Sequence, residues 1–222
     1  MQDQRAELQW RDGRVPVSTR FDDPYFSLDD GLAETRHVFL DGNDLPKRFR
    51  DGFHIAELGF GTGLNMLTAW AAWEQAEQDT PLRFTSFEAY PMTPADMARA
   101  LDAFPALTRW RDRFLAAWQG SGFCDLGSLH LRMVQGDARR MLPDWHGRAD
   151  AWFLDGFSPA RNPELWDRDL MAQVARHTVP GGTVATYTAA GFVRRGLQDA
   201  GFTVSRTPGY GRKRHMTRGI LT

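Results

Sequence analysis

Residues 57–65, Glu-Leu-Gly-Phe-Gly-Thr-Gly-Leu-Asn, decide the fold of this chain. A short apolar run over 53–58 leads into this segment, and a pattern with helical periodicity follows over 64–75. Glycines in such a turn permit positive φ angles and a close approach of ligand to backbone, and the helix N-terminus attracts a negative group. In open α/β sheets, ligands lie at the carboxyl ends of the strands. The segment therefore predicts a site for a nucleotide-like cofactor.

The pattern of strand, turn and helix repeats along the rest of the chain, which is typical of a parallel sheet covered on both faces. Glycines between 120 and 127 indicate a loop, and the turn at 180–182 precedes the fifth strand. No helix separates the last two strands, so they pair as a hairpin. We predict an α/β fold: a mostly parallel seven-stranded sheet with an antiparallel C-terminal hairpin and helices on both faces. The expected strands are 53–58, 82–88, 129–134, 149–154, 183–187, 202–205 and 217–221.

Residues 1–50 differ from the rest of the chain. The pair Asp12-Gly13 between two short runs is a hairpin signal. A polar and aromatic loop follows over 21–27, and Asp29 or Asp30 is placed to cap a short helix. We expect residues 1–50 to form an N-terminal extension that packs on a catalytic domain over 51–222.

The composition is that of an ordinary globular protein. Of the 222 residues, 42% are hydrophobic and 25% are charged, which excludes a disordered segment, a fibre or a mini-protein scaffold. No apolar run approaches the ~20 residues of a membrane span, and the N-terminus lacks the pattern of a signal peptide. Cys124 is the single cysteine, so the cytoplasm is the expected compartment. The six histidines show no metal-ligand spacing, and we expect no metal.

The net charge of −1 hides an uneven distribution. Residues 201–222 carry five basic side chains and no acid, so the remainder carries about −6. This asymmetry predicts either a basic face on an acidic body or a solvated terminal strand, and charge alone does not separate the two.

The glycine spacing and the acids near it favour a cationic cofactor. The turn reads Gly-x-Gly-x-Gly, whereas dinucleotide-binding proteins have Gly-x-Gly-x-x-Gly. Glu57 precedes the first glycine by two residues. An anion there repels a pyrophosphate but suits the amino group or sulfonium of S-adenosylmethionine.

Three further acids stand at the ends of expected strands. Glu88 ends the second strand, where it can accept both ribose hydroxyls; Asp137 follows the third strand, where it can accept from an adenine amino group. Asp155 ends the fourth strand. Each acid alone is equally well explained as a helix cap or a solvated loop residue. Together they predict a crevice fringed by carboxylates.

Several segments, taken together, resemble the methyltransferase domain of the MnmC family. The most specific is residues 155–163, Asp-Gly-Phe-Ser-Pro-Ala-Arg-Asn-Pro, within the matching segment 150–166, and the resemblance covers nearly the whole chain. The other matching segments are 21–27, 57–65, 87–88, 180–183, 191–202 and 209–214. The resemblance implies a Rossmann-like class I methyltransferase that uses S-adenosylmethionine. The implied substrate is tRNA, with methyl transfer to the amine of 5-aminomethyl-(2-thio)uridine at the wobble position.

The resemblance and the acid pattern together give candidate site residues. The candidates for cofactor binding are Tyr25, Glu57, Gly59, Gly61, Thr62, Gly63, Asn65, Glu88, Asp137 and Asp155. The candidates for catalysis are Asp155, Phe157 and Asn162. The candidates for RNA binding are Arg194, Arg195, Arg212, Lys213 and Arg214. Asp155 is expected to orient the reacting nitrogen rather than to act as a general base, and Phe157 and Trp166 either contact the base or belong to the core. Asn162-Pro163 is similar to the Asn/Asp-Pro-Pro-aromatic loop of amine methylases, except that Glu164 replaces the second proline.

Three alternatives remain open at this point. The first is a methyltransferase acting on a small-molecule amine, which would need the same cofactor residues. The second is a nicotinamide-dependent oxidoreductase, which the glycine spacing disfavours. The third is a non-catalytic tRNA-binding module, for which the acids have no use. Members of the resembled family often carry a flavin-dependent oxidase domain as well, so a flavin oxidase domain or partner outside this chain is possible.

Overall fold

The computed structural model describes residues 5–27, 30–120 and 122–222. Of the two expected helix caps, Asp29 lies outside these residues. Asp30 caps helix α1 (Gly31–Thr35), because its side chain accepts a hydrogen bond from the backbone N–H of Ala33 at 2.9 Å.

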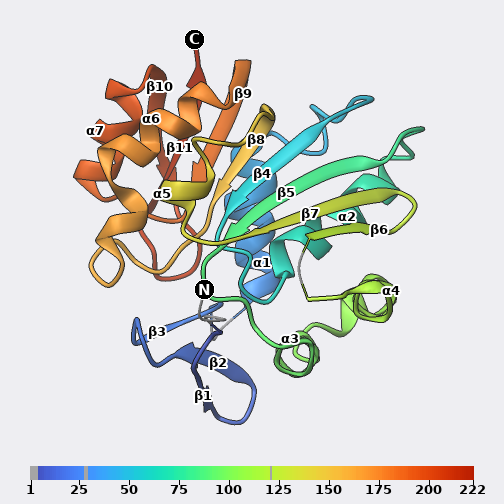
Figure 1. Cartoon of the computed structure of the whole chain (residues 1–222). Coiled ribbons are helices and arrows are strands. Elements are labelled where there is room, and N and C mark those ends of the chain that lie inside the picture. Colours follow the sequence, from blue (N-terminus) through green and yellow to red (C-terminus); the bar gives the residue numbers. More distant parts are fainter. Residues whose placement is uncertain (1–4, 28–29, 121) are drawn as a thin grey trace.

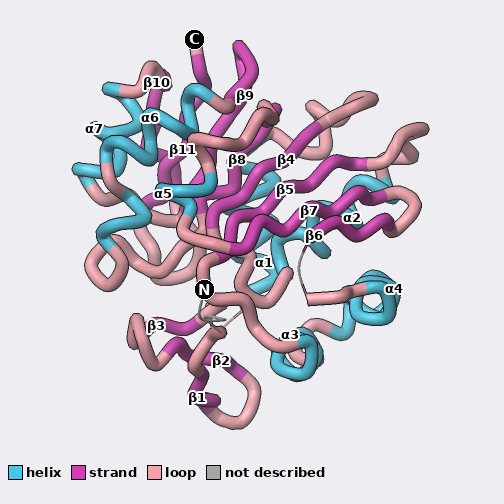
Figure 2. The backbone as a smooth tube through the Cα atoms, in the orientation of Figure 1, coloured by secondary structure: helices cyan, strands magenta, loops and turns pink. Residues whose placement is uncertain are grey.

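The main sheet runs through the centre of the molecule (Figures 1 and 2). In the described part of the chain it has eight strands, in the order β10-β11-β9-β8-β4-β5-β7-β6. The strands β7, β5, β4, β8 and β9 are parallel, while β11 is antiparallel to both β9 and β10. The strands are β4 (His54–Leu58), β5 (Leu82–Glu88), β6 (Gly122–Asp125), β7 (Leu129–Gln135), β8 (Ala149–Leu154), β9 (Thr178–Thr186), β10 (Phe202–Pro208) and β11 (His215–Leu221). The predicted mostly parallel sheet with an antiparallel C-terminal hairpin is confirmed.

Two details of the predicted sheet are wrong. The expected loop at 120–127 contains the eighth strand, β6, which pairs antiparallel with β7 and places Cys124 opposite Leu131. Four residues with two glycines nearby are too short to show a strand period, so pairing with β7 rather than local sequence forms this edge. The fifth strand begins at Thr178 rather than Thr183, because residues 178–182 continue the pairing with β8 through an irregularity in register.

Helices cover both faces of the sheet, as predicted. Residues alternate between the faces along β4: Ile55 packs into one core and Ala56 into the other. The core that contains Ile55 includes residues of α1, α2, α3 and α4, and the core that contains Ala56 includes residues of α5, α6 and α7. The other α-helices are α2 (Leu64–Gln75), α3 (Pro94–Leu101), α4 (Thr108–Ala117), the short α5 (Ala138–Met141), α6 (Arg168–Arg176) and α7 (Gly191–Asp199). Short helical turns are η1 (Arg36–Leu40), η2 (Asp41–Asn43), η3 (Pro105–Leu107) and η4 (Pro163–Trp166).

The N-terminal residues form a second, small antiparallel sheet of β1 (Leu8–Arg11), β2 (Val15–Ser18) and β3 (Asp23–Pro24), which lies below the main sheet in Figure 1. Asp12 and Gly13 form the β1–β2 turn, both with positive φ. Further along, Leu32 and Phe49 pack into the same core as the main sheet. The division of the chain at residue 50 stays a prediction.

Candidate active site

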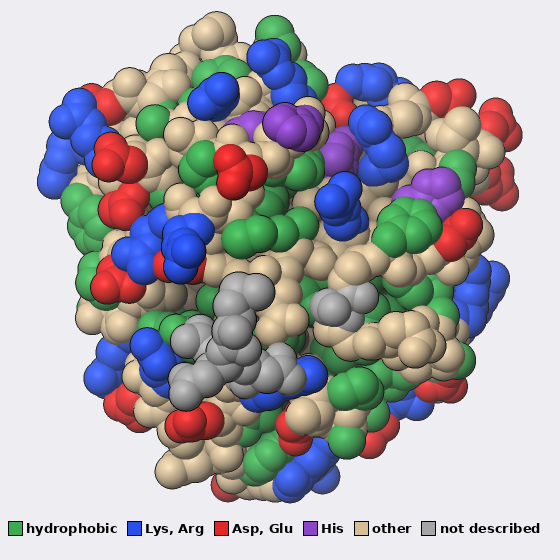
Figure 3. Space-filling view, viewed as in Figure 1, with side chains coloured by type: hydrophobic (Ala, Val, Ile, Leu, Met, Phe, Trp, Pro, Cys, Tyr) green, Lys and Arg blue, Asp and Glu red, His purple; other side chains and the backbone are tan. Residues whose placement is uncertain are grey.

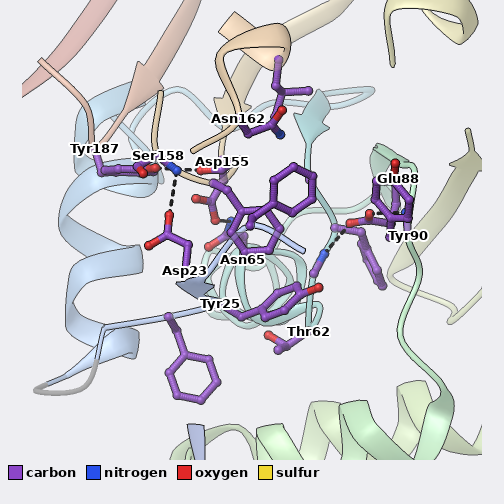
Figure 4. Close-up of a pocket in the computed structure, with 18 of the residues that line it drawn as sticks. Asp23, Tyr25, Thr62, Asn65, Glu88, Tyr90, Asp155, Ser158, Asn162 and Tyr187 are labelled. Atoms are coloured by element: carbon purple, nitrogen blue, oxygen red, sulfur yellow. Dashed lines mark hydrogen bonds between the residues drawn. The ribbon is translucent and has the colours of Figure 1, made fainter. Parts of the chain in front are cut away.

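The carboxyl ends of the parallel strands meet at one edge of the sheet and carry a cavity of about 1320 Å³. Backbone pairing continues one residue past the strands: Asp155 N–H donates to Leu58 O at 3.0 Å, and Gly59 N–H donates to Phe87 O at 2.9 Å. These bonds hold the first glycine turn and the loop after β8 side by side. The side chains that follow the strands therefore face a common space (Figure 4).

The first glycine of the turn is required by this close approach. Gly59 has φ +91°, and a Cβ atom there would lie 1.9 Å from the carbonyl oxygen of Asp155. Gly63, in the left-handed conformation, is the N-cap residue of α2. A larger residue at position 59 would push apart the two loops that form the cavity.

The middle of the glycine turn faces residues 21–27, which we call the N-terminal segment. A Cβ atom at Gly61 would lie 3.1 Å from the ring of Tyr25, so the tyrosine covers this glycine directly. The next residue, Thr62, is buried and lines the cavity together with Gly61 and Tyr25. Burial raises the pKa of Tyr25 far above its ordinary value, so its hydroxyl stays protonated.

The side-chain amide of Asn65 links Glu57 in β4 to Asp155, which follows β8. Asn65 Nδ2 donates to Glu57 Oε1 at 3.0 Å and to Asp155 Oδ2 at 2.6 Å. Asn65 Oδ1 accepts from the hydroxyl of Thr35 at 3.0 Å, and Glu57 Oε2 accepts from the hydroxyl of Ser86 at 2.6 Å. Both polar atoms of the Asn65 side chain therefore have partners, and its nitrogen holds the two carboxylates in place.

Burial changes the ionisation of both carboxylates. It raises the pKa of Glu57 to about 8 and the pKa of Asp155 to about 7. The Asn65 hydrogen bond and the charge of Lys213 act against this shift at Asp155, and the nearby acids add to it. Glu57 is fully buried and, within the described part of the chain, does not line the cavity, whereas Asp155 and Asn65 do. A cation bound in the cavity would favour the charged form of Asp155 directly and of Glu57 through the low dielectric around it.

Glu88 at the end of β5 and Asp137 after β7 both line the cavity, and their pKa values shift in opposite directions. Glu88 accepts hydrogen bonds from the backbone N–H groups of Gly61 at 3.0 Å and Tyr90 at 2.8 Å, and burial raises its pKa. Asp137 caps α5 by accepting from the N–H of Arg139 and forms an ion pair with the guanidinium of Arg139 at 2.6 Å. The hydrogen bonds from Arg139 lower the pKa of Asp137, so it is ionised at neutral pH.

The N-terminal segment holds the loop that follows β8. The ring of Phe157 stacks on Phe21 at 4.7 Å and meets the edge of Tyr25 at 4.9 Å. The backbone N–H of Ser158 donates to Asp23 Oδ2 at 2.8 Å, as the dashed line in Figure 4 shows. The two segments, about 135 residues apart in sequence, form one wall of the cavity.

Further along this loop, one residue lines the cavity and another belongs to the core. Asn162 lines the cavity just before η4, and Figure 4 shows it across from Tyr25. Trp166 belongs to the core instead: it is buried and its Nε1 donates to the carbonyl oxygen of Phe157 at 2.9 Å. Tyr187, directly after β9, closes the cavity, and its hydroxyl donates to the carbonyl oxygen of Gly156 at 2.7 Å.

The basic residues of the C-terminal loop do not form a single surface. Lys213 Nζ lies 2.7 Å from Glu34 Oε1 and 4.1 Å from the ring centre of Tyr187, within the cavity. Arg212 also lines the cavity, whereas Arg214 is exposed outside it. Within the described residues, Lys213 therefore differs from the other residues expected to contact phosphates because it has a carboxylate partner.

Among the residues that the structure describes, those that line the cavity do not include Arg194, Arg195, Arg206 or Arg214. Desolvation, and after it the charges of Arg206, Arg214 and Arg194, lower the pKa of His215. Within the described ranges, none of Arg194, Arg195, Arg206, Arg212 and Arg214 forms an ion pair with a carboxylate. On the face seen in Figure 3, basic and acidic side chains are interspersed.

Some residues of the cavity were absent from the sequence-based set. Phe21 and Asp23 belong to the segment 21–27 that carried part of the resemblance, and Tyr187 ends an expected strand at the carboxyl edge. These three had a signal in the sequence. Glu34 had none, because it meets Lys213 across 179 residues of chain.

Among residues 5–27, 30–120 and 122–222, no cluster of three or more His, Cys, Asp or Glu side chains is arranged to hold a metal ion. No helix in the same ranges has the length and apolar character needed to cross a membrane.

The residues around the cavity fit S-adenosylmethionine. The turn at Gly59 leaves no room for a Cβ atom because the backbone of Asp155 packs against it, and this close approach holds both segments at the cavity that they line. Glu88 and Asp155 offer carboxylate oxygens to hydroxyl, amino or sulfonium groups, and the aromatic rings of Tyr25 and Phe157 bound the space between them.

Comparison with known proteins agrees with this chemistry. Residues 104–222, more than half of the chain, match a family described as S-adenosyl-L-methionine-dependent methyltransferase. The chain is also similar to the crystal structure of MNMC2 from Aquifex aeolicus, with 25% sequence identity and a TM-score of 0.76, over 100% of this chain and 72% of that one.

Two more distant structures share the fold alone. TrmN from Thermus thermophilus is 18% identical with a TM-score of 0.52, over 82% of this chain and 47% of that chain. DesVI from Streptomyces venezuelae is 13% identical with a TM-score of 0.50, over 86% of this chain and 92% of that chain. The family match, the glycine turn and the carboxylate-lined cavity lead to one conclusion: the chain belongs to the family of S-adenosyl-L-methionine-dependent methyltransferases.

Proposed function

We propose that this methyltransferase modifies tRNA, and that its acceptor is the amine of 5-aminomethyl-(2-thio)uridine at the wobble position. The observation that carries the proposal is the position of Asp155, which lies in the cavity between the glycine turn and the aromatic loop after β8 and is bound by Asn65. The whole-chain similarity to MNMC2 supports the same conclusion.

The cofactor end of the cavity is assigned to the glycine turn and the acids next to it. S-adenosylmethionine supplies an electrophilic methyl group on a sulfonium. Glu88 is proposed to accept from the ribose hydroxyls and Asp137 from the adenine amino group. Asn65, held by Glu57, is proposed to position Asp155 near the methionine part of the cofactor. The remaining proposed contacts are the backbone and side chains of Tyr25, Gly59, Gly61, Thr62 and Gly63.

The acceptor end is assigned to Asp155. Transfer to nitrogen is an in-line displacement that needs a free lone pair, and neutralising an alkyl ammonium with a pKa of ~10.4 at pH 7 costs roughly 4 to 5 kcal/mol. A carboxylate that accepts a hydrogen bond from the amine orients its lone pair. Because burial raises the pKa of Asp155 to about 7, the same carboxylate can also take the proton that the amine releases.

The base itself is assigned to the loop that follows β8. Phe157 presents an aromatic surface in the cavity, and Asn162 presents an amide that can hydrogen-bond to the edge of a base. Both would exclude water from the reacting amine. This wall lies next to Asp155, as the reaction requires.

The tRNA backbone is assigned to the arginines of α7, of β10 and of the loop between β10 and β11. These arginines have no carboxylate partner among the described residues, which leaves them available to phosphates and favours a polyanionic substrate over a small free amine. The proposed phosphate contacts are Arg194, Arg195, Arg206, Arg212 and Arg214. An enzyme with this substrate would act in the cytoplasm, with residues 1–50 as an extension over the catalytic domain.

Nucleoside analysis of tRNA tests the proposal. tRNA that carries 5-aminomethyl-2-thiouridine is incubated with the full chain and S-adenosylmethionine, digested and analysed by mass spectrometry. We expect 5-methylaminomethyl-2-thiouridine to replace the starting nucleoside. Asp155→Asn protein should bind the cofactor in calorimetry and convert the nucleoside more slowly by ~10² or more. Methylation of another nucleoside, or of none by a folded, cofactor-binding protein, would refute the proposal.

A further inference from the structure

The side chain of Lys213 occupies a place in the cavity that is suited to any alkylammonium group. Its nitrogen lies 2.7 Å from a carboxylate oxygen of Glu34 and 4.1 Å from the ring centre of Tyr187. A carboxylate together with an aromatic face is a recurring way to bind an ammonium group. The hydroxyl of Tyr187 donates to Gly156, which fixes the ring in this orientation.

The two partners of this ion pair differ in burial. The side chain of Glu34 is 12% exposed, whereas that of Lys213 is 45% exposed. A buried carboxylate without a cation is strongly unfavourable. Lysine, by contrast, is a point charge on a flexible four-carbon stem that hydrates readily. Lys213 can therefore leave for water only if another cation takes its place beside Glu34.

The charges around this place favour a second cation. The carboxylates of Asp23, Glu34 and Asp155 come from the N-terminal segment, from α1 and from the loop after β8, and all three line the cavity. The charge of Lys213 lowers the pKa of Asp155, whereas the charges of Glu34 and Asp23 raise it. The other charged or titratable groups facing this end of the cavity from neighbouring elements are Tyr187, Tyr210 and Arg212.

We propose that Glu34 and the face of Tyr187 form the binding subsite for the ammonium group of the methyl acceptor, and that Lys213 fills this subsite until the acceptor arrives. The inference rests on the proposed function, since it takes a primary alkylamine as the acceptor. Beside Asp155, the subsite receives the amine as a cation. The amine then loses its proton to Asp155 before its nitrogen lone pair attacks the methyl carbon, and the bond from that carbon to sulfur breaks.

The position of Lys213 in the chain couples this exchange to RNA binding. Lys213 stands between Arg212 and Arg214, two of the proposed phosphate contacts, in a short loop between β10 and β11. The glycine at 211 in this loop has φ +56° and no neighbour that a Cβ atom would meet within 4 Å. When phosphates bind the flanking arginines, the same short segment can withdraw the lysine.

The test uses methylammonium as the probe, with the full chain and without tRNA. Its affinity is measured by ligand-observed NMR at pH 8 for the wild type, Lys213→Met and Lys47→Met. Lys47 is the only other lysine of the chain and is exposed, so its substitution removes the same charge elsewhere. We expect Lys213→Met to bind methylammonium at least tenfold more tightly than the wild type and Lys47→Met to match the wild type. Equal affinity of Lys213→Met and the wild type would overturn the proposal. If the methionine variant does not fold, Lys213→Gln serves in the same measurement.

A second variant locates the binding place. Glu34→Gln combined with Lys213→Met should lose the tenfold gain, since it removes the carboxylate of the subsite. Tight methylammonium binding that survives this change would also overturn the proposal. In turnover with tRNA, Glu34→Gln alone should raise KM for the acceptor more than it lowers kcat. The probe measurement needs neither tRNA nor turnover, so a failure of wobble methylation would refute the proposed function without affecting this result.

Discussion

The side-chain nitrogen of Asn65 lies 2.6 Å from a carboxylate oxygen of Asp155, so the first turn of α2 and the loop after β8 share one hydrogen bond in the lining of the cavity. The same nitrogen also contacts Glu57 at 3.0 Å. An amide is well suited to this place because it brings two acids together without adding a charge. One side chain therefore contributes to the ionisation and to the position of both acids.

Replacement of Asn65 should weaken cofactor binding. Asn65→Ala leaves two buried carboxylates without their shared donor, a loss of about 1 to 3 kcal/mol per unsatisfied group. We expect the dissociation constant for S-adenosylmethionine in calorimetry to rise at least tenfold. Gln75→Ala, at the exposed C-terminal end of the same helix, should leave it unchanged. Unaltered affinity of Asn65→Ala would show that this amide does not organise the site.

Glu57 should make the protein without cofactor less stable as the pH rises. Its pKa is about 8 in the folded protein against an ordinary value of 4.5, so the folded state holds a proton that the unfolded state releases. The resulting stabilisation is complete below pH 4.5. It is lost as the pH rises to about 8, at about 1.4 kcal/mol per pH unit.

Glu57→Gln removes this loss. Glutamine can keep an oxygen towards Asn65 and turn its amide NH₂ towards the hydroxyl of Ser86. In urea denaturation, we expect the free energy of unfolding of the variant to exceed that of the wild type at pH 8, by more than at pH 5. A variant that is equally destabilised at both pH values would contradict the protonated state of Glu57.

Asp155 should give the pH–rate profile of the reaction an acidic limb, over which the rate falls as the pH decreases. Because burial raises its pKa to about 7, its carboxylate becomes available as the pH rises through that value. We expect kcat/KM for the tRNA to increase with pH around 7. Asp155→Asn should lower the rate by ~10² or more and remove this limb. Persistence of the same limb in the asparagine variant would assign it to another group.

The glycine at 59 should tolerate no side chain. Gly59→Ala places a Cβ atom 1.9 Å from a backbone oxygen and also strains a φ of +91°. Gly52→Ala is a matched control, because Gly52 has φ +72° and a Cβ atom there would meet nothing within 4 Å. Backbone strain alone costs roughly 1 to 2 kcal/mol. We expect Gly52→Ala to lose that amount in denaturation and keep cofactor binding, and Gly59→Ala to lose cofactor binding. Equal behaviour of the two variants would disprove the close approach.

Arg214 should contribute to tRNA binding through phosphates. Arg214→Ala is expected to weaken binding and to reduce the slope of log affinity against log salt by about 0.7 to 0.9. Arg83→Ala is the control, since Arg83 is an exposed arginine near the opposite, amino end of β5. Filter binding over a range of salt concentrations measures both. A slope that Arg214→Ala leaves unchanged would remove this residue from the interface.

The sequence predicted the order of strands and helices because buried parallel strands are apolar runs with glycine-rich ends. It also predicted that acids would gather at the carboxyl edge, since that edge follows from topology alone. Local pattern could not predict β6, whose four residues become a strand only by pairing with β7.

Side-chain partners were harder to predict than positions. Lys213 lies within a basic stretch, and its sequence neighbours favoured phosphate binding; only the folded chain brings Glu34 to it. Asp137 likewise caps a helix and pairs with Arg139 in addition to lining the cavity. The sequence offered a helix cap and a cavity residue as alternatives, and Asp137 is both.

The central claim is that this cavity delivers a methyl group to an amine of tRNA. An anticodon stem-loop with 5-aminomethyluridine at the wobble position should be compared with one that carries 5-hydroxymethyluridine, which has an oxygen in place of the nitrogen. Transfer of a radiolabelled methyl group from S-adenosylmethionine is measured for both. We predict transfer to the amine and none to the alcohol; equal labelling of the two, or labelling of neither, would contradict the account.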